Sequence, residues 1–263
     1  MWPDSANSPR PHCFRRPPGN QHPRSGKPTN GRCPIGRQGF GGLLTDDQWA
    51  RLAKAGRTRS FAAQETMIRQ GEREDSVFLL LEGMVKVTMV QPDGTGLLLA
   101  LRGHGESLGE LSALSGLPRS ATVMPSTGRC LTRVLTSAQF RLLVKSMDLE
   151  QVLWRHLVRR QTESDSLRAE MASLTARQRL AATLLRLAQL MGSGSESAPR
   201  SARRSVVVRL GLSQRELGDS IGLSRAAVAE EFKRLRGLGV IRTGREFVAI
   251  ADVDRLQAIA QAE

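Results

Sequence analysis

The sequence predicts an α+β fold in which a small antiparallel β-barrel is followed by one long helix and a compact C-terminal region. Three observations support this prediction. Between residues 76 and 135, short apolar segments are separated by closely spaced glycines, as the turns of a small barrel require. Residues 148–175 contain no proline or glycine and repeat apolar side chains at helical spacing. Residues 212–250 contain two helix-capping patterns followed by a hairpin signal.

The predicted barrel occupies residues 43–147. One apolar segment ends at Gly83, and the segment after it alternates between apolar and polar side chains. Gln91-Pro-Asp-Gly94 has the composition of a hairpin turn, so the segments on either side of it are expected to pair. The expected strands are Ser76–Gly83, Met84–Val90, Gly96–Leu101, Ala121–Met124 and Cys130–Leu135.

The segment GELSALSGLPRSATV, which begins at Gly109, combines groups that suit a phosphate and a sugar. The Glu110 carboxylate can accept a hydrogen bond from a ribose hydroxyl. The planar cation of Arg119 suits a phosphate, to which Ser120 can add a hydroxyl donor. Gly109 leaves room for an anion to approach the backbone N–H groups of a short helix expected at Leu111–Ala113. The alternative is a surface turn with an incidental arginine.

The strand pattern resembles the cyclic-nucleotide-binding β-roll, and Gly109–Val123 resembles the phosphate-binding cassette of that family. The Gly, Glu, Leu, Pro-Arg-Ser and Ala of the motif are all in place, and the match covers Leu43 to Arg141 without a large insertion. The resemblance implies a ligand site formed by Gly109, Glu110, Leu111, Arg119 and Ser120.

Residues 148–175 are expected to form a dimerisation helix. Heptad spacing places one set of side chains on a stripe that can pair with a copy of itself. The alternative is a helix that packs on its own domain. Two polar residues interrupt the stripe, and polar residues in such a seam cost stability. The predicted seam is Leu153, Leu157, Arg160, Ser164, Leu167, Met171 and Leu174.

Residues 176–252 are expected to form a winged helix-turn-helix. Ser213 begins the first helix in a capping box with Glu216, and Ser224 caps the second helix. Gly222 permits the tight turn after the first helix. The second helix is the candidate reader of the major groove. Its expected buried face is Val228, Phe232 and Leu235.

After this second helix, Gly239–Ile250 is expected to form a β-hairpin wing that turns at Thr243-Gly244. Residues 253–263 are expected to be a C-terminal tail. The alternative to the winged helix-turn-helix is a plain helical hairpin.

The order of β-roll, long helix and winged helix-turn-helix resembles the Crp/Fnr family, which is named for the cyclic-AMP receptor protein and the fumarate–nitrate reduction regulator. The resemblance runs from Leu43 to Ile250. It implies that Ser164 and Asp165 meet the purine base of the ligand. Asp165 departs from the family pattern, in which Ser or Asn is more usual. Its carboxylate can accept from the exocyclic amine of adenine, or it can select a different ligand.

The resemblance also implies a set of DNA contacts. Ser213 and Ser224 would meet phosphates, and Arg225 would contact a base edge, typically guanine. Ala226 offers only apolar contact, and Glu230 either accepts from a cytosine amine or faces solvent. This reading set predicts an operator that differs from the best-known one. The expected DNA-binding residues are Ser213, Gln214, Ser224, Arg225, Ala226, Glu230 and Lys233.

These features predict a dimeric transcription regulator controlled by a cyclic nucleotide, with cyclic AMP as the first candidate and cyclic GMP as the second. The expected partners are double-stranded DNA, a second copy of the chain and RNA polymerase, with no membrane partner and no metal. The alternative is a regulator of the same fold with another effector or with ligand-independent DNA binding. An enzyme is not expected, because the sequence has no nucleophile–base constellation.

Charge and composition fit this prediction. The formal net charge is +14. Residues 43–176 are nearly neutral, whereas residues 177–263 hold fifteen basic and nine acidic side chains. A basic C-terminal region indicates a nucleic-acid partner. Residues 1–42 are rich in Pro, Gly, Ser, Asn and Arg and are expected to be a disordered basic tail. We favour a solvated tail, or an extension that the working protein lacks, over an arm on the DNA backbone.

The remaining signals exclude several alternatives. Cys13, Cys33 and Cys130 are too far apart for a disulfide framework or an iron–sulfur cluster. A haem-sensing variant would need histidine or cysteine ligands, but His104 and His156 are expected at the surface. No apolar segment approaches the ~20 residues of a membrane helix, and no signal peptide is evident, so a cytoplasmic protein is expected.

Overall fold

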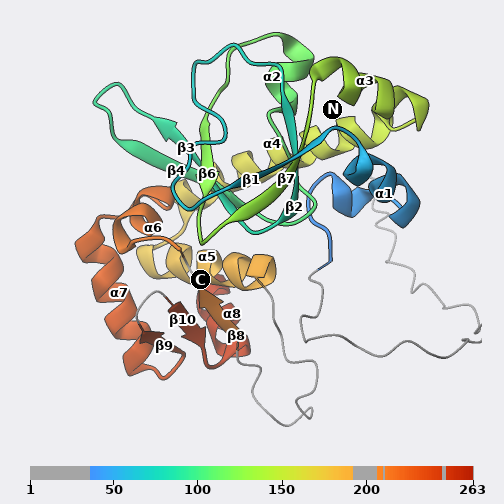
Figure 1. Cartoon of the computed structure of the whole chain (residues 1–263). Helices are drawn as coiled ribbons and strands as arrows, with labels where there is room; N and C mark the ends of the chain where they lie inside the picture. The colour runs from blue at the N-terminus through green and yellow to red at the C-terminus, as the bar shows by residue number, and fades with distance from the viewer. Residues whose placement is uncertain (1–35, 192–205, 210, 245–246, 263) are drawn as a thin grey trace, which may run out of the picture. The chain divides into compact units, whose positions relative to one another are not determined.

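The computed structural model describes residues 36–191, 206–209, 211–244 and 247–262. It confirms the predicted α+β architecture, with a β-rich N-terminal domain, a long helix and a C-terminal domain of helices and a small sheet (Figure 1). Most of the predicted N-terminal tail lies outside the described residues. The last residues of this predicted tail are ordered. Phe40 is fully buried in an apolar cluster of the N-terminal domain, and Gly41–Leu43 form the short 3-10 helix η1.

The barrel consists of two antiparallel sheets. One sheet has the strand order β1-β7-β2-β5 and the other has the order β4-β3-β6. Strands of both sheets contribute to one apolar cluster that includes Phe61, Phe78, Leu108 and Val123. All five expected strands are present, whereas β1 and the short strand β5 were not foreseen. The bounds are β1 Arg57–Phe61, β2 Val77–Glu82, β3 Val85–Val90, β4 Gly96–Arg102, β5 Ser107–Leu108, β6 Thr122–Pro125 and β7 Cys130–Leu135.

Two amphipathic helices cover the barrel and begin in the same way. In α1 (Asp46–Lys54) and α3 (Ser137–Ser146), the threonine before the helix forms a capping box with a glutamine three residues into it. Both helices share an apolar cluster with Phe40 and with Leu153 of the long helix. The N-terminal end of the long helix is therefore anchored on its own domain.

The long helix α4 (Glu150–Ser173) agrees with the predicted element, but the predicted seam faces a different way. Leu153 is buried in the chain's own core, and Leu157, Arg160, Ser164 and Leu167 are half-buried. The reason is that one stripe of this amphipathic helix must cover the barrel. An exposed stripe is formed by residues that each follow a predicted seam residue by one position in the sequence, so their spacing is again four and three. It consists of Trp154, Val158, Gln161, Asp165, Arg168 and Ala172, which we call the outer stripe.

The C-terminal domain contains the predicted helix-turn-helix and two elements that were not predicted. Strand β8 (Val206–Arg209) completes a sheet of order β8-β10-β9. The predicted tail at residues 253–263 is wrong, because α8 (Val253–Gln261) follows an N-cap at Asp252 and buries Leu256 completely. The other elements are α5 Ala176–Met191, α6 Gln214–Ser220, α7 Arg225–Gly237, β9 Ile241–Gly244 and β10 Phe247–Ile250.

The wing is confirmed as an antiparallel pair of β9 and β10. Thr243 and Gly244, which were expected at its turn, belong to β9, and the connecting residues 245–246 lie outside the described part. The predicted buried face of α7 is also confirmed, since Val228, Phe232 and Leu235 are all fully or almost fully buried.

The β3–β4 hairpin contacts the DNA-binding part of the chain. Leu98 and Leu101 of β4 belong to the same apolar cluster as Leu217 and Ile221, which lie on or just after α6. The Lys86 ammonium lies 2.8 Å from the Glu216 carboxylate, which also completes the α6 capping box. Figure 1 shows α6 beside this hairpin. The barrel and the helix-turn-helix thus share part of one core.

His156 is buried rather than exposed, which corrects the expectation for this residue. Only 2% of it is accessible, its ring packs against Phe40, and its Nε2 lies 3.4 Å from Ser107 Oγ. Burial, together with the nearby Arg160 and Arg102 cations, lowers the pKa of His156 to about 3. The imidazole is therefore neutral in the folded protein at neutral pH.

This burial predicts a component of acid sensitivity. The unfolded chain protonates His156 near pH 6.5, but the folded chain does so only near pH 3, so protons favour unfolding within this window. We expect His156→Gln, which cannot titrate, to reduce the loss of unfolding free energy between pH 7 and pH 5 by about 2 kcal/mol. Urea denaturation at both pH values measures the difference. Equal losses in the two proteins would contradict a buried neutral His156.

Candidate functional site

The predicted phosphate loop forms a sharp connection between β5 and the short helix α2 (Glu110–Ser115). Gly109 has a φ of 82°, in the left-handed region that favours glycine. A Cβ at this position would lie 2.3 Å from Arg119 Nη1 and 2.9 Å from the Ser76 carbonyl oxygen. The glycine is therefore required both by the backbone conformation and by the close approach of the arginine.

Arg119 is held beneath this loop. It is 3% exposed and donates hydrogen bonds to the carbonyls of Gly109 at 2.7 Å and Ser76 at 2.6 Å. Its Nε is buried and has no hydrogen-bond partner among the described residues. Burial lowers the pKa of Arg119, although Glu74 and Asp75 oppose this effect. A buried guanidinium with an unused donor is suited to an anionic ligand.

Glu110 is completely buried, and one of its two oxygens is free. Its Oε1 accepts a hydrogen bond of 2.6 Å from Arg160 Nη1, whereas Oε2 is buried without a partner among the described residues. Burial raises the pKa of Glu110, and the Arg160 cation opposes this effect. An unsatisfied buried carboxylate oxygen is costly, so it indicates a missing hydrogen-bond donor such as a sugar hydroxyl.

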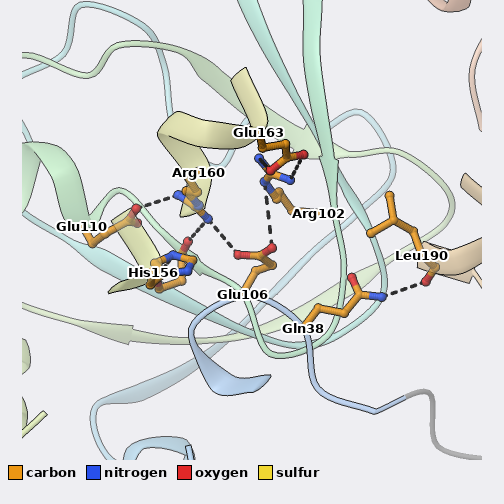
Figure 2. Close-up of polar contacts among 9 residues, drawn as sticks. Gln38, Arg102, Glu106, Glu110, His156, Arg160, Glu163 and Leu190 are labelled. Carbon is orange, nitrogen blue, oxygen red and sulfur yellow. Dashed lines mark hydrogen bonds and ion pairs between the residues drawn. The ribbon is translucent and has the colours of Figure 1, made fainter. Parts of the chain in front are cut away.

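Arg160 joins the candidate site, although in the sequence it stands out only as an interruption of the predicted seam. Its second terminal nitrogen donates to Glu106 Oε2 at 2.8 Å and to the Ser107 carbonyl at 2.7 Å. Figure 2 shows its guanidinium between the two carboxylates. The sequence signal for this role is the charge of Arg160 at a heptad position that faces the protein. A cation at such a position needs a carboxylate partner.

A second arginine extends this ionic cluster. Arg102, at the end of β4, forms two hydrogen bonds of 2.9 Å with the Glu163 carboxylate on α4. Its Nε lies 3.9 Å from Glu106 Oε1. Figure 2 shows the resulting row from Glu163 through Arg102 and Glu106 to Arg160. Arg102 was not among the predicted site residues.

A cavity of about 680 Å³ unites most of the predicted ligand residues, and this volume is typical of small-molecule sites. The loop and Arg160 form part of its wall, and β3 and β4 contribute apolar side chains. The C-terminal end of α6 also contributes Asp219 and Ser220. Of the predicted ligand residues, those that line the cavity are Gly109, Glu110, Leu111, Arg119, Ser120 and Ser164.

Asp165 does not line this cavity. It lies on the outer stripe, where its carboxylate accepts hydrogen bonds from Gln161 Nε2 at 3.0 Å and Arg168 Nη1 at 2.8 Å. Ser164 and Asp165 therefore point to different sides of α4, because adjacent helical residues are separated by about 100°. The structure brings only Ser164 to the site within one chain.

The predicted DNA-binding residues lie on an exposed surface of the helix-turn-helix. Ser213 and Ser224 cap α6 and α7 as predicted, each through a hydrogen bond from the backbone three residues ahead. Glu230 Oε1 lies 3.4 Å from Arg234 Nε, so this carboxylate is tied to a neighbouring cation. The exposed set consists of Ser213, Gln214, Ser224, Arg225, Ala226, Glu230 and Lys233.

No helix in the described part of the chain is both long and apolar enough to cross a membrane.

Comparisons with known proteins agree with this architecture. Residues 58–147 match the family described as the cyclic nucleotide-binding domain, and residues 178–259 match the Crp-like helix-turn-helix domain. The chain is similar to the CRP-like cAMP-activated global transcriptional regulator of Mycobacterium tuberculosis, with 28% identity over 79% of this chain and 89% of the relative.

Two solved structures show the same fold. A CRP/FNR family transcriptional regulator from Thermus thermophilus has a TM-score of 0.62 and 25% identity, over 78% of this chain and 99% of that one. The c-di-GMP responsive global regulator CLP of Xanthomonas campestris also has a TM-score of 0.62, with 19% identity over 78% and 99% of the two chains. With its cyclic-nucleotide-binding domain and its Crp-like helix-turn-helix, the chain belongs to the Crp/Fnr family of DNA-binding transcription regulators, which are not enzymes.

Proposed function

We propose that this protein is a homodimeric, sequence-specific transcription regulator whose DNA binding is controlled by a cyclic nucleotide. The observation that carries the proposal is one cavity wall with a buried arginine, a hydroxyl and a buried carboxylate that has an unused oxygen. These groups match a phosphate and a ribose at the same time. Cyclic AMP is the first candidate, since the Mycobacterium tuberculosis relative is named as cAMP-activated. Cyclic GMP is the second.

In this proposal each part of the ligand has its own partner. Arg119 and Ser120 bind the phosphate, with Gly109 and Leu111 beside it in the loop. The ribose hydroxyl donates to Glu110 Oε2, which satisfies the buried oxygen. The base lies toward α4, where Ser164 lines the cavity.

A second candidate is a regulator with a different effector or with ligand-independent DNA binding. Asp165 favours it, because its carboxylate is already engaged by Gln161 and Arg168 and lies outside the cavity. The fold shared with a regulator named as c-di-GMP responsive supports it as well. Titration with cyclic AMP and cyclic GMP separates the two candidates.

The outer stripe of α4 is the proposed dimer contact. Trp154 and Val158 are 68% and 58% exposed, and large apolar side chains on one helix stripe are typical of helix pairing. Asp165 belongs to the same stripe, so in a dimer it lies near the partner copy. This placement makes Asp165 a candidate to reach the base in the partner's site.

In the proposed complex, α7 enters the major groove of double-stranded DNA. Arg225 contacts a guanine edge, and Ser213, Gln214, Ser224 and Lys233 meet the backbone. Ala226 and Glu230 complete the reading set. As a regulator of transcription, the protein is proposed to act in the cytoplasm together with RNA polymerase.

The phosphate assignment predicts a large loss of affinity in Arg119→Leu. Removing a buried charged donor should weaken binding of cyclic AMP or cyclic GMP by about 100-fold. Isothermal titration calorimetry measures this loss, and circular dichroism checks the fold. Arg129→Leu, an exposed barrel arginine, is the matched control and should bind normally. A folded Arg119→Leu protein with unchanged affinity would contradict the assignment.

The dimer assignment predicts that charge on the outer stripe separates the subunits. Introducing Trp154→Glu and Val158→Glu together should raise the dimer dissociation constant at least about 100-fold, since two apolar contacts per chain are lost. Analytical ultracentrifugation measures this constant. Leu142→Glu, on the exposed face of α3, serves as the control. A double variant that remains as dimeric as the control would exclude this stripe as the interface.

The proposed DNA contacts predict different effects for substitutions at two residues of α7. Arg225→Ala should reduce discrimination at one base pair by about 10- to 150-fold, because a bidentate base contact is lost. Lys233→Ala should instead weaken binding to all duplexes equally and lower the salt dependence. Selection from randomised duplexes followed by anisotropy titrations compares them. An Arg225→Ala protein that keeps the full base preference would refute its role as a reader.

A further inference from the structure

The ionic cluster in the wall of the candidate ligand cavity includes Arg102 and Glu163, to which the proposed function gives no contact with the nucleotide. We propose that Arg102 is a positioning residue that sets the Glu110 carboxylate for the ribose and thereby determines selectivity for the 2′-hydroxyl. This inference rests on the proposed function of the cavity. Arg102 acts through its neighbours, because Glu110 itself is paired with Arg160.

The first step of the argument concerns how Arg160 is held. Its guanidinium bonds to three acceptors, namely Glu110 Oε1, Glu106 Oε2 and the Ser107 carbonyl. Because the guanidinium is rigid and planar, the position of Glu106 determines which edge of it remains for Glu110. The orientation of Glu110 thus depends on a carboxylate on the far side of Arg160.

The second step is that Arg102 contacts Glu106, which binds Arg160, and Glu163, which lies on the same helix as Arg160. On the barrel side, its Nε lies 3.9 Å from Glu106 Oε1. On the helix side, it binds both oxygens of Glu163, which lies one turn after Arg160 on α4. Bidentate pairs of this kind fix geometry as well as charge. Arg102 therefore holds the turn of α4 that carries Arg160 and the loop that carries Glu106 (Figure 2).

The third step is the balance of charge. Three carboxylates, those of Glu106, Glu110 and Glu163, share two guanidinium groups. The side chains of Glu106 and Glu110 are only 6% and 1% exposed. Without Arg102, the one remaining arginine must neutralise both buried carboxylates, and an uncompensated buried charge is strongly unfavourable. Arg160 should then shift toward Glu106, and Glu110 should lose its set orientation.

The test is the ratio of affinities for cyclic AMP and 2′-deoxy-cyclic AMP, measured by isothermal titration calorimetry on the full chain. One hydrogen bond to a carboxylate predicts about a tenfold or greater preference for the ribose form in the unsubstituted protein. In Arg102→Met the preference should fall to about threefold or less, while affinity for the deoxy ligand changes by less than about threefold. Arg102→Lys keeps the charge but lacks the planar guanidinium, so its preference for the ribose form should be intermediate.

Two further variants separate positioning from stability. Arg133→Met removes another half-buried arginine, which bonds to the Ala53 carbonyl and does not line the cavity, so it should leave the ratio unchanged. Glu163→Gln keeps the shape of its side chain but removes its charge, and it should lower the ratio at least about twofold. It tests the proposal even where Arg102→Met does not fold.

The outcomes distinguish this inference from the proposed function. If the unsubstituted protein binds neither cyclic AMP nor cyclic GMP at millimolar concentration, the proposed function fails and the inference fails with it. If the protein binds them, three results would overturn the inference alone. These are no preference for the ribose form in the unsubstituted protein, an unchanged ratio in Arg102→Met and Glu163→Gln, and equal loss of affinity for both ligands.

Discussion

The ion pair between Arg160 and Glu110 is the interaction on which the rest of the structure depends. It joins the loop between β5 and α2 to the long helix α4 at a separation of 2.6 Å, where the Glu110 carboxylate is completely buried. A buried carboxylate requires a partner, so α4 must present a cation at this position. The helix is consequently held with one face on its own barrel, and this orientation decides which stripe of α4 remains exposed.

The same arrangement offers a physical route from the cavity to the DNA-binding helices. Strand β4 supplies side chains to the cavity wall, and its Leu98 and Leu101 also enter the core of the helix-turn-helix. The end of α6 borders the cavity, and Lys86 binds the glutamate that caps this helix. A ligand that displaces β4 would therefore act on a strand that is packed directly against α6, so no distant relay is required.

The local parts of this architecture could be predicted from the sequence, whereas the long-range pairings could not. Alternation and the turn at Gln91–Gly94 located β3 and β4, and two serines located the starts of α6 and α7, because these signals act over a few residues. Strand β8 and helix α8 were missed, since their stability comes from partners far along the chain. Arg160 appeared only as a break in a seam, and Ser164 was assigned to the ligand only through the family resemblance, because heptad spacing does not distinguish a stripe that covers the barrel from one that pairs with a copy.

The central claim is that occupancy of this cavity changes DNA affinity. The most direct measurement is a fluorescence anisotropy titration of the full chain with a duplex that it has selected from a random pool, with and without cyclic AMP or cyclic GMP. We expect at least about a fivefold change in the dissociation constant with one of these nucleotides, the lower end of typical allosteric coupling. Identical titration curves in the presence of saturating, calorimetrically confirmed nucleotide would contradict the account.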